Sequence, residues 1–375
     1  MGLFRGVELA DLTLSTDRLL LRRWLPDDAA RVYEAMQDAS TRRFLVHVPD
    51  PYGRGDAREF VTGAGHEGRD NGTGLGSAVV ERASGRVVGA AALRLRGDPE
   101  IGYWVAPDAR GHGYAAEGTR LLTGWAMGLG VPRVELHCDV RNLPSARTAL
   151  RAGFAFEGIA SSARQGGGTN GVPARYGDDA RFARTADDSG DAVEPAFPRL
   201  PDGGLTDGVV TLRPARPEDA QGYLEDDDPV AVSWGFDGRP RTHRQAEQRM
   251  AGAGLEWLVG RNAWLTVVDV GTGAFAGDLQ VRRGGPPGVA ELGYAVHPAF
   301  RGRGYTSRAL RLIVPWVFEV AGFGRIEVGA KRGNIASQRA AQTAGFRPDG
   351  IRERRLRNAD GSFADEVCFV LLRPA

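Results

Sequence analysis

The segment RGHGYA, residues 110–115, places two glycines after an arginine, between a predicted strand and a predicted helix. Glycine lets the backbone adopt left-handed conformations and approach a ligand closely. The first turn of the following helix adds unpaired N–H groups and the positive end of a dipole, and this combination binds phosphate. Because an arginine can pair with a second phosphate, a pyrophosphate is the natural ligand of such a loop.

The same loop returns later in the chain as RGRGYT, residues 301–306, at an offset of 191 residues. The segment LRRWLPDDA, residues 21–29, is repeated at that offset as LRPARPEDA, residues 212–220. Further on, VRNLPSARTALRAGFAFEGI (140–159) matches AKRGNIASQRAAQTAGFRPDGI (330–351) at an offset of 192. Since chance similarity does not keep its register over such a length, the chain is a duplication or fusion of two homologous domains. The long period excludes a solenoid.

The residues of the loop alone leave three interpretations open. The first is a structural turn without a ligand, which is common for a short glycine motif. The second is a dinucleotide-binding fingerprint, Gly111-x-Gly113-x-x-Ala116, but that fingerprint belongs after the first strand of a parallel βαβ unit, whereas this loop follows a later strand. The third is a site for coenzyme A. A P-loop is excluded because no Gly-Lys-Ser/Thr follows the glycines.

The loop resembles motif A of the GNAT acetyltransferases, Arg/Gln-x-x-Gly-x-Gly/Ala. Each half also carries the later signature of that family, an Asn-x-x-Ser followed by Ala-Gly-Phe: Asn142, Ser145 and Phe154 in the first half, and Asn334, Ser337 and Phe346 in the second. Within the family, the Glu-Ile/Leu-Gly-Tyr strand before the loop is most similar to the RimJ/RimL group, which acetylates protein N-termini. The resemblance covers residues 15–185 and 208–375. Its ordered elements occur twice, so it indicates the family strongly without indicating the acceptor.

The resemblance implies acetyl-CoA as the cofactor. In the family the strand before motif A splays from its neighbour, and its backbone binds the pantetheine arm; here these stretches are residues 103–106 and 294–297. The cofactor-binding residues implied are Val105, Arg110, Gly111, His112, Gly113, Tyr114, Ala115 and Asn142 in the first half, and Val296, Arg301, Gly302, Arg303, Gly304, Tyr305, Thr306 and Asn334 in the second. Thr306 departs from the pattern, because Gly or Ala is usual there.

Acyl transfer from a thioester to an amine needs a neutral amine, stabilisation of the tetrahedral oxyanion and a proton for the leaving thiolate. Glu100 and Glu291 each lie ten residues before a motif A arginine, a spacing similar to that of the base glutamate in the histone acetyltransferase branch. Each is therefore a candidate base, acting directly or through a water. The alternative is a solvent-exposed carboxylate at the start of a strand.

Ser145 and Ser337 complete the predicted catalytic set. By resemblance to RimL they protonate the departing thiolate, a role that a tyrosine has in many other members of the family. The alternative is that Asn142 and Asn334 are helix N-caps and that the serines only occupy the first helical turn. Capping and cofactor contact are compatible for the asparagines.

The order of predicted elements is the same in each half: a strand, a helix that begins at Pro-Asp-Asp or Pro-Glu-Asp, two strands around a turn, another strand, the glycine loop, a helix, a strand, a short helix and a last strand. This order predicts an α+β fold of two tandem GNAT-like domains, each a mixed, largely antiparallel twisted sheet flanked by helices. A Pro/Gly/Asp-rich linker, residues 185–208, separates domain 1–184 from domain 209–375. The first half carries a glycine-rich insertion within residues 163–177, which we expect to affect acceptor use.

Composition limits the partners of the chain. A formal net charge of +1 gives no sign of a nucleic-acid surface. No run approaches the roughly 18 apolar residues of a membrane helix, so no membrane partner is expected. The two cysteines lie in apolar strand-like runs and no Cys/His cluster has zinc spacing. We therefore predict a cytoplasmic protein with no metal site and no disulfide framework.

The acceptor that we expect is a primary amine, first of all the α-amino group of a peptide or protein. The alternative acceptor is a small-molecule amine, such as an antibiotic or an amino-acid metabolite. A different alternative is that one copy is not catalytic and only binds coenzyme A or supports the other copy. The acidic run at residues 225–228 suits a cationic acceptor, although a charge run usually forms a solvated face. A monomer and a homodimer are both compatible with a fused pair.

Overall fold

The computed structural model describes residues 8–45, 48–95, 98–166, 175–235, 239–358 and 360–374. The chain forms two compact units, Met1–Glu194 and Pro195–Ala375, called here the first and the second unit. The boundary between them lies inside the predicted linker, residues 185–208. Phe197 and Leu200 are buried in the core of the second unit, so the later part of that segment packs onto the second unit.

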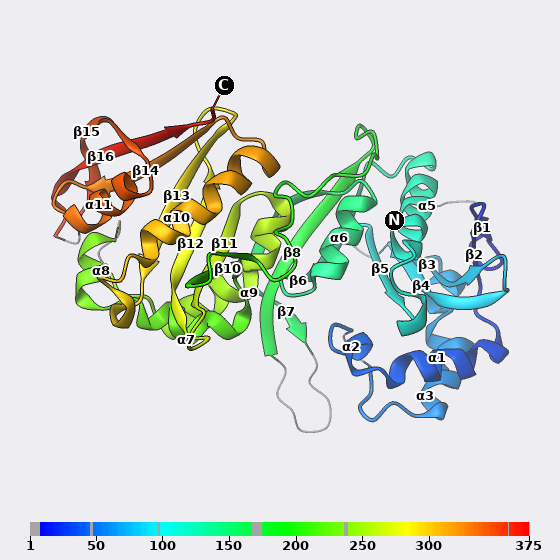
Figure 1. Cartoon of the computed structure of the whole chain (residues 1–375). Helices are drawn as coiled ribbons and strands as arrows, with labels where there is room; N and C mark the ends of the chain where they lie inside the picture. The colour runs from blue at the N-terminus through cyan, green and yellow to red at the C-terminus, as the bar shows by residue number, and fades with distance from the viewer. Residues whose placement is uncertain are drawn as a thin grey trace. The chain divides into compact units, whose positions relative to one another are not determined.

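The strands and helices of the first unit follow the predicted order with two differences (Figure 1). Several short helices stand where one was predicted after the first strands, and the unit ends in two strands where one was predicted. The strands are β1 (Leu14–Ser15), β2 (Leu19–Arg22), β3 (Gly74–Glu81), β4 (Arg86–Arg94), β5 (Glu100–Val105), β6 (Arg133–Asp139), β7 (Ala155–Gly166) and β8 (Arg175–Thr185). The helices are η1 (Pro26–Asp28), α1 (Ala29–Gln37), α2 (Ala39–Arg42), α3 (Arg54–Glu59), η2 (Phe60–Ala64), α4 (Glu67–Asp70), η3 (Pro107–Ala109), α5 (Tyr114–Gly128) and α6 (Leu143–Arg151). Residues 167–174 of the predicted insertion lie outside the described residues.

The second unit repeats this order. Its strands are β9 (Leu205–Thr206), β10 (Val210–Pro214), β11 (Asn262–Asp269), β12 (Phe275–Arg283), β13 (Val289–Val296), β14 (Arg325–Lys331), β15 (Arg347–Arg357) and β16 (Phe363–Leu372). Its helices are η4 (Pro217–Asp219), α7 (Ala220–Glu225), α8 (Pro229–Trp234), α9 (His243–Val259), η5 (Pro298–Phe300), α10 (Tyr305–Pro315), η6 (Trp316–Val320) and α11 (Ile335–Thr343).

Each unit contains one eight-stranded sheet with the same strand order. In the first unit the order is β1-β2-β3-β4-β5-β6-β8-β7, and in the second it is β9-β10-β11-β12-β13-β14-β16-β15. The pairs β5–β6 and β13–β14 are parallel, and the other neighbours in both sheets are antiparallel. The predicted α+β class, with a mixed and largely antiparallel sheet in each half, is confirmed.

An arginine–aspartate pair explains why the segment at residues 21–29 recurs at residues 212–220. Arg22 at the end of β2 donates hydrogen bonds of 2.7 and 2.9 Å to Asp28 in η1. In the second unit Arg213 and Asp219 make the same pair at 2.7 and 2.6 Å. Both aspartates are buried, and a buried carboxylate requires such charged partners. The segment therefore fixes a strand-to-helix turn, which is a structural role.

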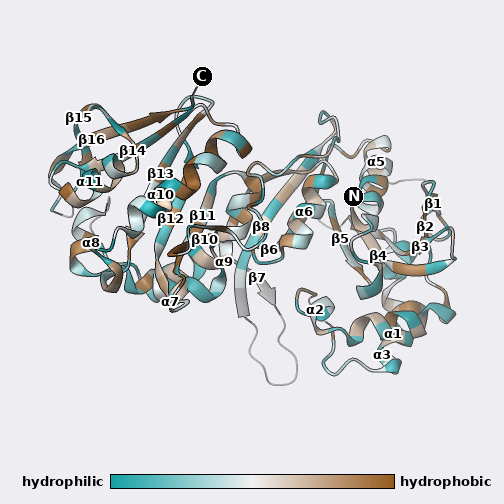
Figure 2. Ribbon diagram, in the orientation of Figure 1, coloured by the Kyte–Doolittle hydropathy of each residue, from teal (hydrophilic) through white to brown (hydrophobic). Residues whose placement is uncertain are grey.

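Apolar residues of strands and helices form the core of each unit. Figure 2 shows hydrophobic stretches on the strands, whereas the helices carry both hydrophobic and hydrophilic residues. In the second unit one large cluster joins the central strands to α10, through residues such as Leu279 and Leu310. In the first unit a cluster around Trp24 includes Met36, Val61 and the partly buried Trp104. Within the described ranges, no helix has the length and apolar character that crossing a membrane requires.

Candidate active site

The two parallel strands of each sheet separate soon after they begin to pair. β5 and β6 are paired only at Glu100 and Glu135, whereas β4 follows β5 as far as Val105. In the second unit β13 and β14 are paired up to Leu292 and Val328. Beyond these points β5 and β13 pair with no further strand of the described ranges on that side, so their backbone N–H and C=O groups are available to a ligand. This is the splay that the resemblance implies.

Both glycine loops adopt the same backbone conformation at the start of a helix. The φ angle is 83° at Gly111 and 82° at Gly113, and it is 74° at Gly302 and 76° at Gly304. A residue with a side chain is strained at such angles, which explains why glycine occupies these positions. Gly113 and Gly304 directly precede α5 and α10. The unpaired N–H groups of both helix starts therefore follow directly on the loops.

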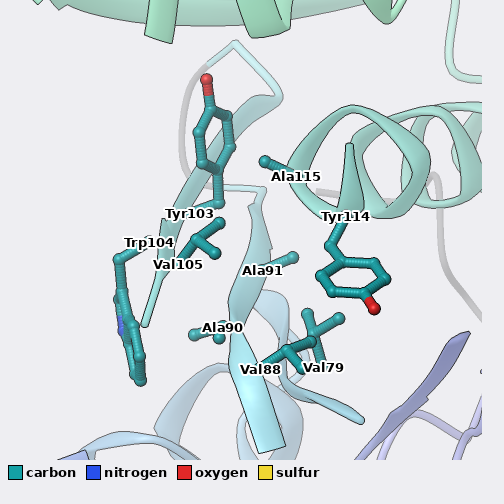
Figure 3. Close-up of a pocket in the computed structure, with 10 residues that line it drawn as sticks. Val79, Val88, Ala90, Ala91, Tyr103, Trp104, Val105, Tyr114 and Ala115 are labelled. Carbon is teal, nitrogen blue, oxygen red and sulfur yellow. The ribbon is translucent and has the colours of Figure 1, made fainter. Parts of the chain in front are cut away.

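A pocket in the first unit joins the splayed strand to the start of α5 (Figure 3). It is lined by Val79, Val88, Gly89, Ala90, Ala91, Tyr103, Trp104, Val105, Tyr114 and Ala115. The structure thus brings together three of the predicted cofactor-binding residues, Val105, Tyr114 and Ala115. Figure 3 shows Tyr103 and Trp104, neighbours on β5, pointing in different directions. An apolar pocket that ends at a helix N-terminus suits a ligand with an apolar arm and an anionic end.

Both motif A arginines bind aspartates, a pairing that the sequence analysis did not predict. Arg110 donates a hydrogen bond of 2.7 Å to Asp38 and one of 2.6 Å to Thr41. Arg301 donates two hydrogen bonds of 2.7 Å to Asp228. Asp38 is the N-cap of α2, and Asp228 is the N-cap of α8. In both units the arginine therefore connects the glycine loop to a helix from the early part of the unit.

These ion pairs hold both aspartates in their ionised form. Hydrogen bonds from Ser40 and then from Arg110 lower the pKa of Asp38 far below its usual range. The hydrogen bond from Arg301 is the main reason why the pKa of Asp228 is lowered to about 2. An anion at either loop would have to share its arginine with a carboxylate or displace that carboxylate. The loop amides are therefore the part of motif A that is ready to bind.

The two predicted glutamates lie at the closed end of the splay. A side-chain oxygen of Glu100 accepts a hydrogen bond of 2.7 Å from its cross-strand neighbour Arg94. Glu291 lies 4.0 Å from Arg282, its own cross-strand neighbour. The side chain of Glu100 is 30% exposed and that of Glu291 is 41% exposed, so solvent reaches both carboxylates.

The two predicted serines each meet a tyrosine across the splay. The Tyr103 hydroxyl on β5 lies 2.8 Å from the Ser145 hydroxyl on α6, and the Tyr294 hydroxyl on β13 lies 2.9 Å from the Ser337 hydroxyl on α11. Burial is the main reason why the pKa of both phenols is raised, so both keep their protons at neutral pH. Sequence reasoning named these tyrosines only for their backbone. The repeated Glu-Ile/Leu-Gly-Tyr pattern was the signal that could have identified them.

The two predicted asparagines cap the helices that carry the serines. The side-chain oxygen of Asn142 accepts a hydrogen bond of 3.3 Å from the N–H of Ser145. That of Asn334 accepts one of 3.1 Å from the N–H of Ser337. A capped first turn holds each serine in place. The capping role considered for the asparagines is therefore present in the structure.

The remaining loop side chains make local contacts. His112 stacks on Tyr114 with ring centroids 5.5 Å apart. In the second unit Arg303 lies 5.5 Å from the ring centre of Phe300. Thr306, at the position of Ala115, is only partly exposed. These positions differ between the units, whereas the first arginine, both glycines and the tyrosine of the loop are the same in both.

The second unit also contains two buried acids that sequence analysis did not single out as a pair. Asp226 is 0% exposed and follows α7, and Asp278 is 3% exposed and lies on β12. Burial first, and then the charge of Asp278, raises the pKa of Asp226 to about 8. Burial likewise raises the pKa of Asp278. The charges of Arg241 and Arg301 oppose the shift at Asp226 without cancelling it.

Replacing Asp226 with asparagine is expected to stabilise the second unit at pH 9 and to have little effect at pH 5. A raised carboxyl pKa favours the folded state below the usual value near 4, and this stabilisation is lost as the pH rises through about 8. Asparagine stays uncharged at every pH. Thermal unfolding should show a gain of at least about 1 kcal/mol at pH 9, or roughly 2–4 °C. Glu225→Gln is the control, because it removes a charge from an exposed neighbour; an equal gain there would contradict the assignment.

Comparisons with known proteins agree with this architecture. The profile of the acetyltransferase (GNAT) domain matches residues 18–155 and 210–347. A probable N-acetyltransferase of Bacillus subtilis (strain 168), YjcK, is 32% identical over 86 residues, which are 23% of this chain and 47% of YjcK. The chain thus spans about half the length of this curated relative.

Each of two solved structures matches about half of this chain, which is the length of one unit. RimJ of Mycobacterium smegmatis, in complex with a CoA disulfide, is 25% identical, with a TM-score of 0.40 over 48% of this chain and 90% of RimJ. A GNAT-family acetyltransferase from Bacillus anthracis is 16% identical, with a TM-score of 0.40 over 45% of this chain and 97% of that protein.

Proposed function

Because the chain belongs to the GNAT acetyltransferase family, we propose that it transfers an acetyl group from acetyl-CoA to a primary amine. The observation that carries the proposal is the repeated site geometry, in which a splayed strand leads to a left-handed glycine loop at a helix start. The α-amino group of a peptide or protein is the first choice of acceptor, because the signatures of both halves resemble those of the RimJ/RimL group. We also propose a cytoplasmic location, which suits a chain with only two cysteines, both of them buried.

The residues present fit acetyl-CoA. The unpaired edge of β5 offers backbone groups to the pantetheine amides, and the pocket of Figure 3 offers an apolar wall beside it. The loop from Arg110 to Gly113 and the first turn of α5 would hold the pyrophosphate through their N–H groups. The second unit offers the same edge on β13 and the loop from Arg301 to Gly304. The bound thioester supplies the acetyl group, and the thiol is the second product.

The side chains of each unit supply the proton transfers. Glu100 is partly exposed, so it accepts a proton from the acceptor ammonium directly or through a water. Bound acetyl-CoA would supply a thioester to which the freed amine adds directly, without a covalent enzyme intermediate. The nitrogen would lose its second proton to solvent as the amide forms and the carbon–sulfur bond breaks. Ser145, hydrogen-bonded to the protonated Tyr103, gives a proton to the leaving sulfur. Glu291, Ser337 and the Tyr294 that contacts it have the same roles in the second unit.

Native mass spectrometry of the full chain with acetyl-CoA tests the proposal. We expect two cofactors per chain, because both loops have the same left-handed geometry. One cofactor per chain would make the other unit a support domain. No binding at cofactor concentrations well above micromolar would overturn the proposed function for both units.

A further inference from the structure

Among the residues that the structure describes, three carboxylate oxygens of the second unit are buried without a hydrogen-bond partner. They are both oxygens of Asp226 and one oxygen of Asp278. The other oxygen of Asp278 accepts a hydrogen bond of 3.2 Å from Gln280. Buried polar groups are nearly always paired, and buried charges almost always so. Two buried acids whose charges act on one another, with three unpaired oxygens, therefore suit a cationic partner that donates several hydrogen bonds and displaces the proton that burial favours.

Asp278 lies level with the opening between the splayed strands, on the strand next to the one that borders it. Asp278 on β12 is paired in register with Ala295 on β13. Ala295 lies beyond Leu292, where the pairing of β13 with β14 ends. On a strand, neighbouring side chains point to opposite faces. Asp278 thus lies opposite to Leu279, which belongs to the core shared with α10, and on the face that α7 covers.

The first unit has apolar residues at the matching positions. There the strand register pairs Ala90 on β4 with Trp104 on β5. Ala90 thus takes the place of Asp278, and Trp104 takes the place of Ala295. Trp104 stacks on Trp24 with ring centroids 6.3 Å apart, so indole rings fill this side of the first sheet. At these two positions the second unit has Asp278 and Ala295, whereas the first unit has Ala90 and Trp104.

The nearby cations of the second unit are engaged with other groups. Arg241 makes a salt bridge of 3.2 Å with Asp227, and its guanidinium lies 3.8 Å from the ring centre of Tyr223. Arg249 lies 4.9 Å from the ring centre of Trp264. Arg301 is held by its two hydrogen bonds to Asp228. These arginines moderate the negative field of the acid pair and leave its three oxygens without a donor.

We propose that Asp226 and Asp278 bind a second ammonium group of the acceptor in the second unit, separate from the amine that gives its proton to Glu291. A primary ammonium has three N–H donors, which matches the three unpaired oxygens in number. Since the pair is buried, the acceptor must reach it with a slender primary ammonium rather than a bulky or quaternary one. The first unit, with Trp104 at this place, has no such pair and takes a different acceptor. This inference rests on the proposed function, because it assigns the acceptor side of the same site.

Binding of n-butylammonium to the full chain tests this inference, with saturation-transfer NMR as the readout. We expect saturable binding that weakens at least tenfold in Asp278→Asn and in Asp226→Asn. Glu225→Gln is the matched control, because it removes the same charge one residue away on an exposed side chain, and it should bind like the wild type. Tetramethylammonium, which has no N–H donor, should not compete.

Several results would overturn the inference. Unchanged n-butylammonium binding in both asparagine variants would show that the two acids only share a proton inside the fold. Equal competition by sodium chloride and by tetramethylammonium chloride would show a nonspecific cation effect. Circular dichroism of each variant separates a lost site from a lost fold, and the second variant remains available if one does not fold. Acetyl-CoA stoichiometry on the same samples tests the proposed function separately, since the acid pair is not part of the glycine loop.

Discussion

Gly113→Val is expected to raise the dissociation constant of acetyl-CoA at the first unit by at least about 100-fold, or about 2.8 kcal/mol. Gly113 has a φ of 82° and is the N-cap of α5. A β-branched residue is strained at this angle, and relieving the strain turns the N–H groups of the helix start away from the phosphate position. A Cβ at Gly113 meets only the Arg18 guanidinium, at 3.9 Å, so volume is not the obstacle. We expect the unit to stay folded, with a cost of about 1–2 kcal/mol.

The control for this variant is Gly85→Val. Gly85 has a φ of 67° in the turn between β3 and β4, and a Cβ there has nothing within 4 Å, so the strain is similar but lies outside the loop. Native mass spectrometry should count one cofactor per chain for Gly113→Val and two for Gly85→Val. Gly304→Val should remove the cofactor of the second unit in the same way. Equal losses from Gly113→Val and Gly85→Val would show that the loop is not the pyrophosphate cradle.

The parts of the site that local sequence determines were predictable. The left-handed glycines and the helix that follows them depend on a few adjacent residues, so the pattern at 110–115 was sufficient. The Asn142 cap is also local, since its partner lies three residues away. The repeat then extended each local inference to the second half. This is why the order of elements in both units matches the sequence prediction as far as the last helix, after which each unit has two strands instead of the one predicted.

The contacts between distant segments were not predictable in the same way. Arg110 and Asp38 are 72 residues apart, and nothing in either segment alone indicates that they meet. The residue at which β5 leaves β6 depends on the register of two strands that a helix separates in sequence. A comparison of the two halves carried a usable signal, because Asp38 and Asp228 both stand just before a short helix.

The acid pair of the second unit could not be predicted from the sequence for a different reason. The run at residues 225–228 looks uniform in sequence, yet the structure gives its members different surroundings. Asp226 is fully buried, while Asp228 pairs with Arg301. Asp278 comes from β12, a strand about 50 residues away. Only the tertiary structure brings the two acids into one electrostatic environment.

Ser145→Ala and Tyr103→Phe are each expected to lower the turnover of the first unit by about 100-fold, with little change in acetyl-CoA affinity. Proton transfer by a positioned side chain contributes roughly this much or more to a rate. The two hydroxyls lie 2.8 Å apart, and the buried Tyr103 keeps its proton at neutral pH. If they deliver the proton to the leaving sulfur as one unit, the double variant should be about as slow as either single one. Rates are best measured in a chain whose second unit is silenced by Gly304→Val.

The same pair occurs in the second unit, so Ser337→Ala and Tyr294→Phe provide the reciprocal measurement in a chain carrying Gly113→Val. A role in packing alone predicts a different pattern, because Tyr103 also holds the backbone oxygen of Ser145 at 3.1 Å. In that case Tyr103→Phe would raise the dissociation constant of acetyl-CoA as much as it lowers turnover, while Ser145→Ala would leave both almost unchanged. Additive losses in the double variant would likewise separate the two hydroxyls into independent roles. The two hydroxyls deliver the proton to the leaving sulfur together if the single and double variants lose turnover equally and keep their affinity for acetyl-CoA.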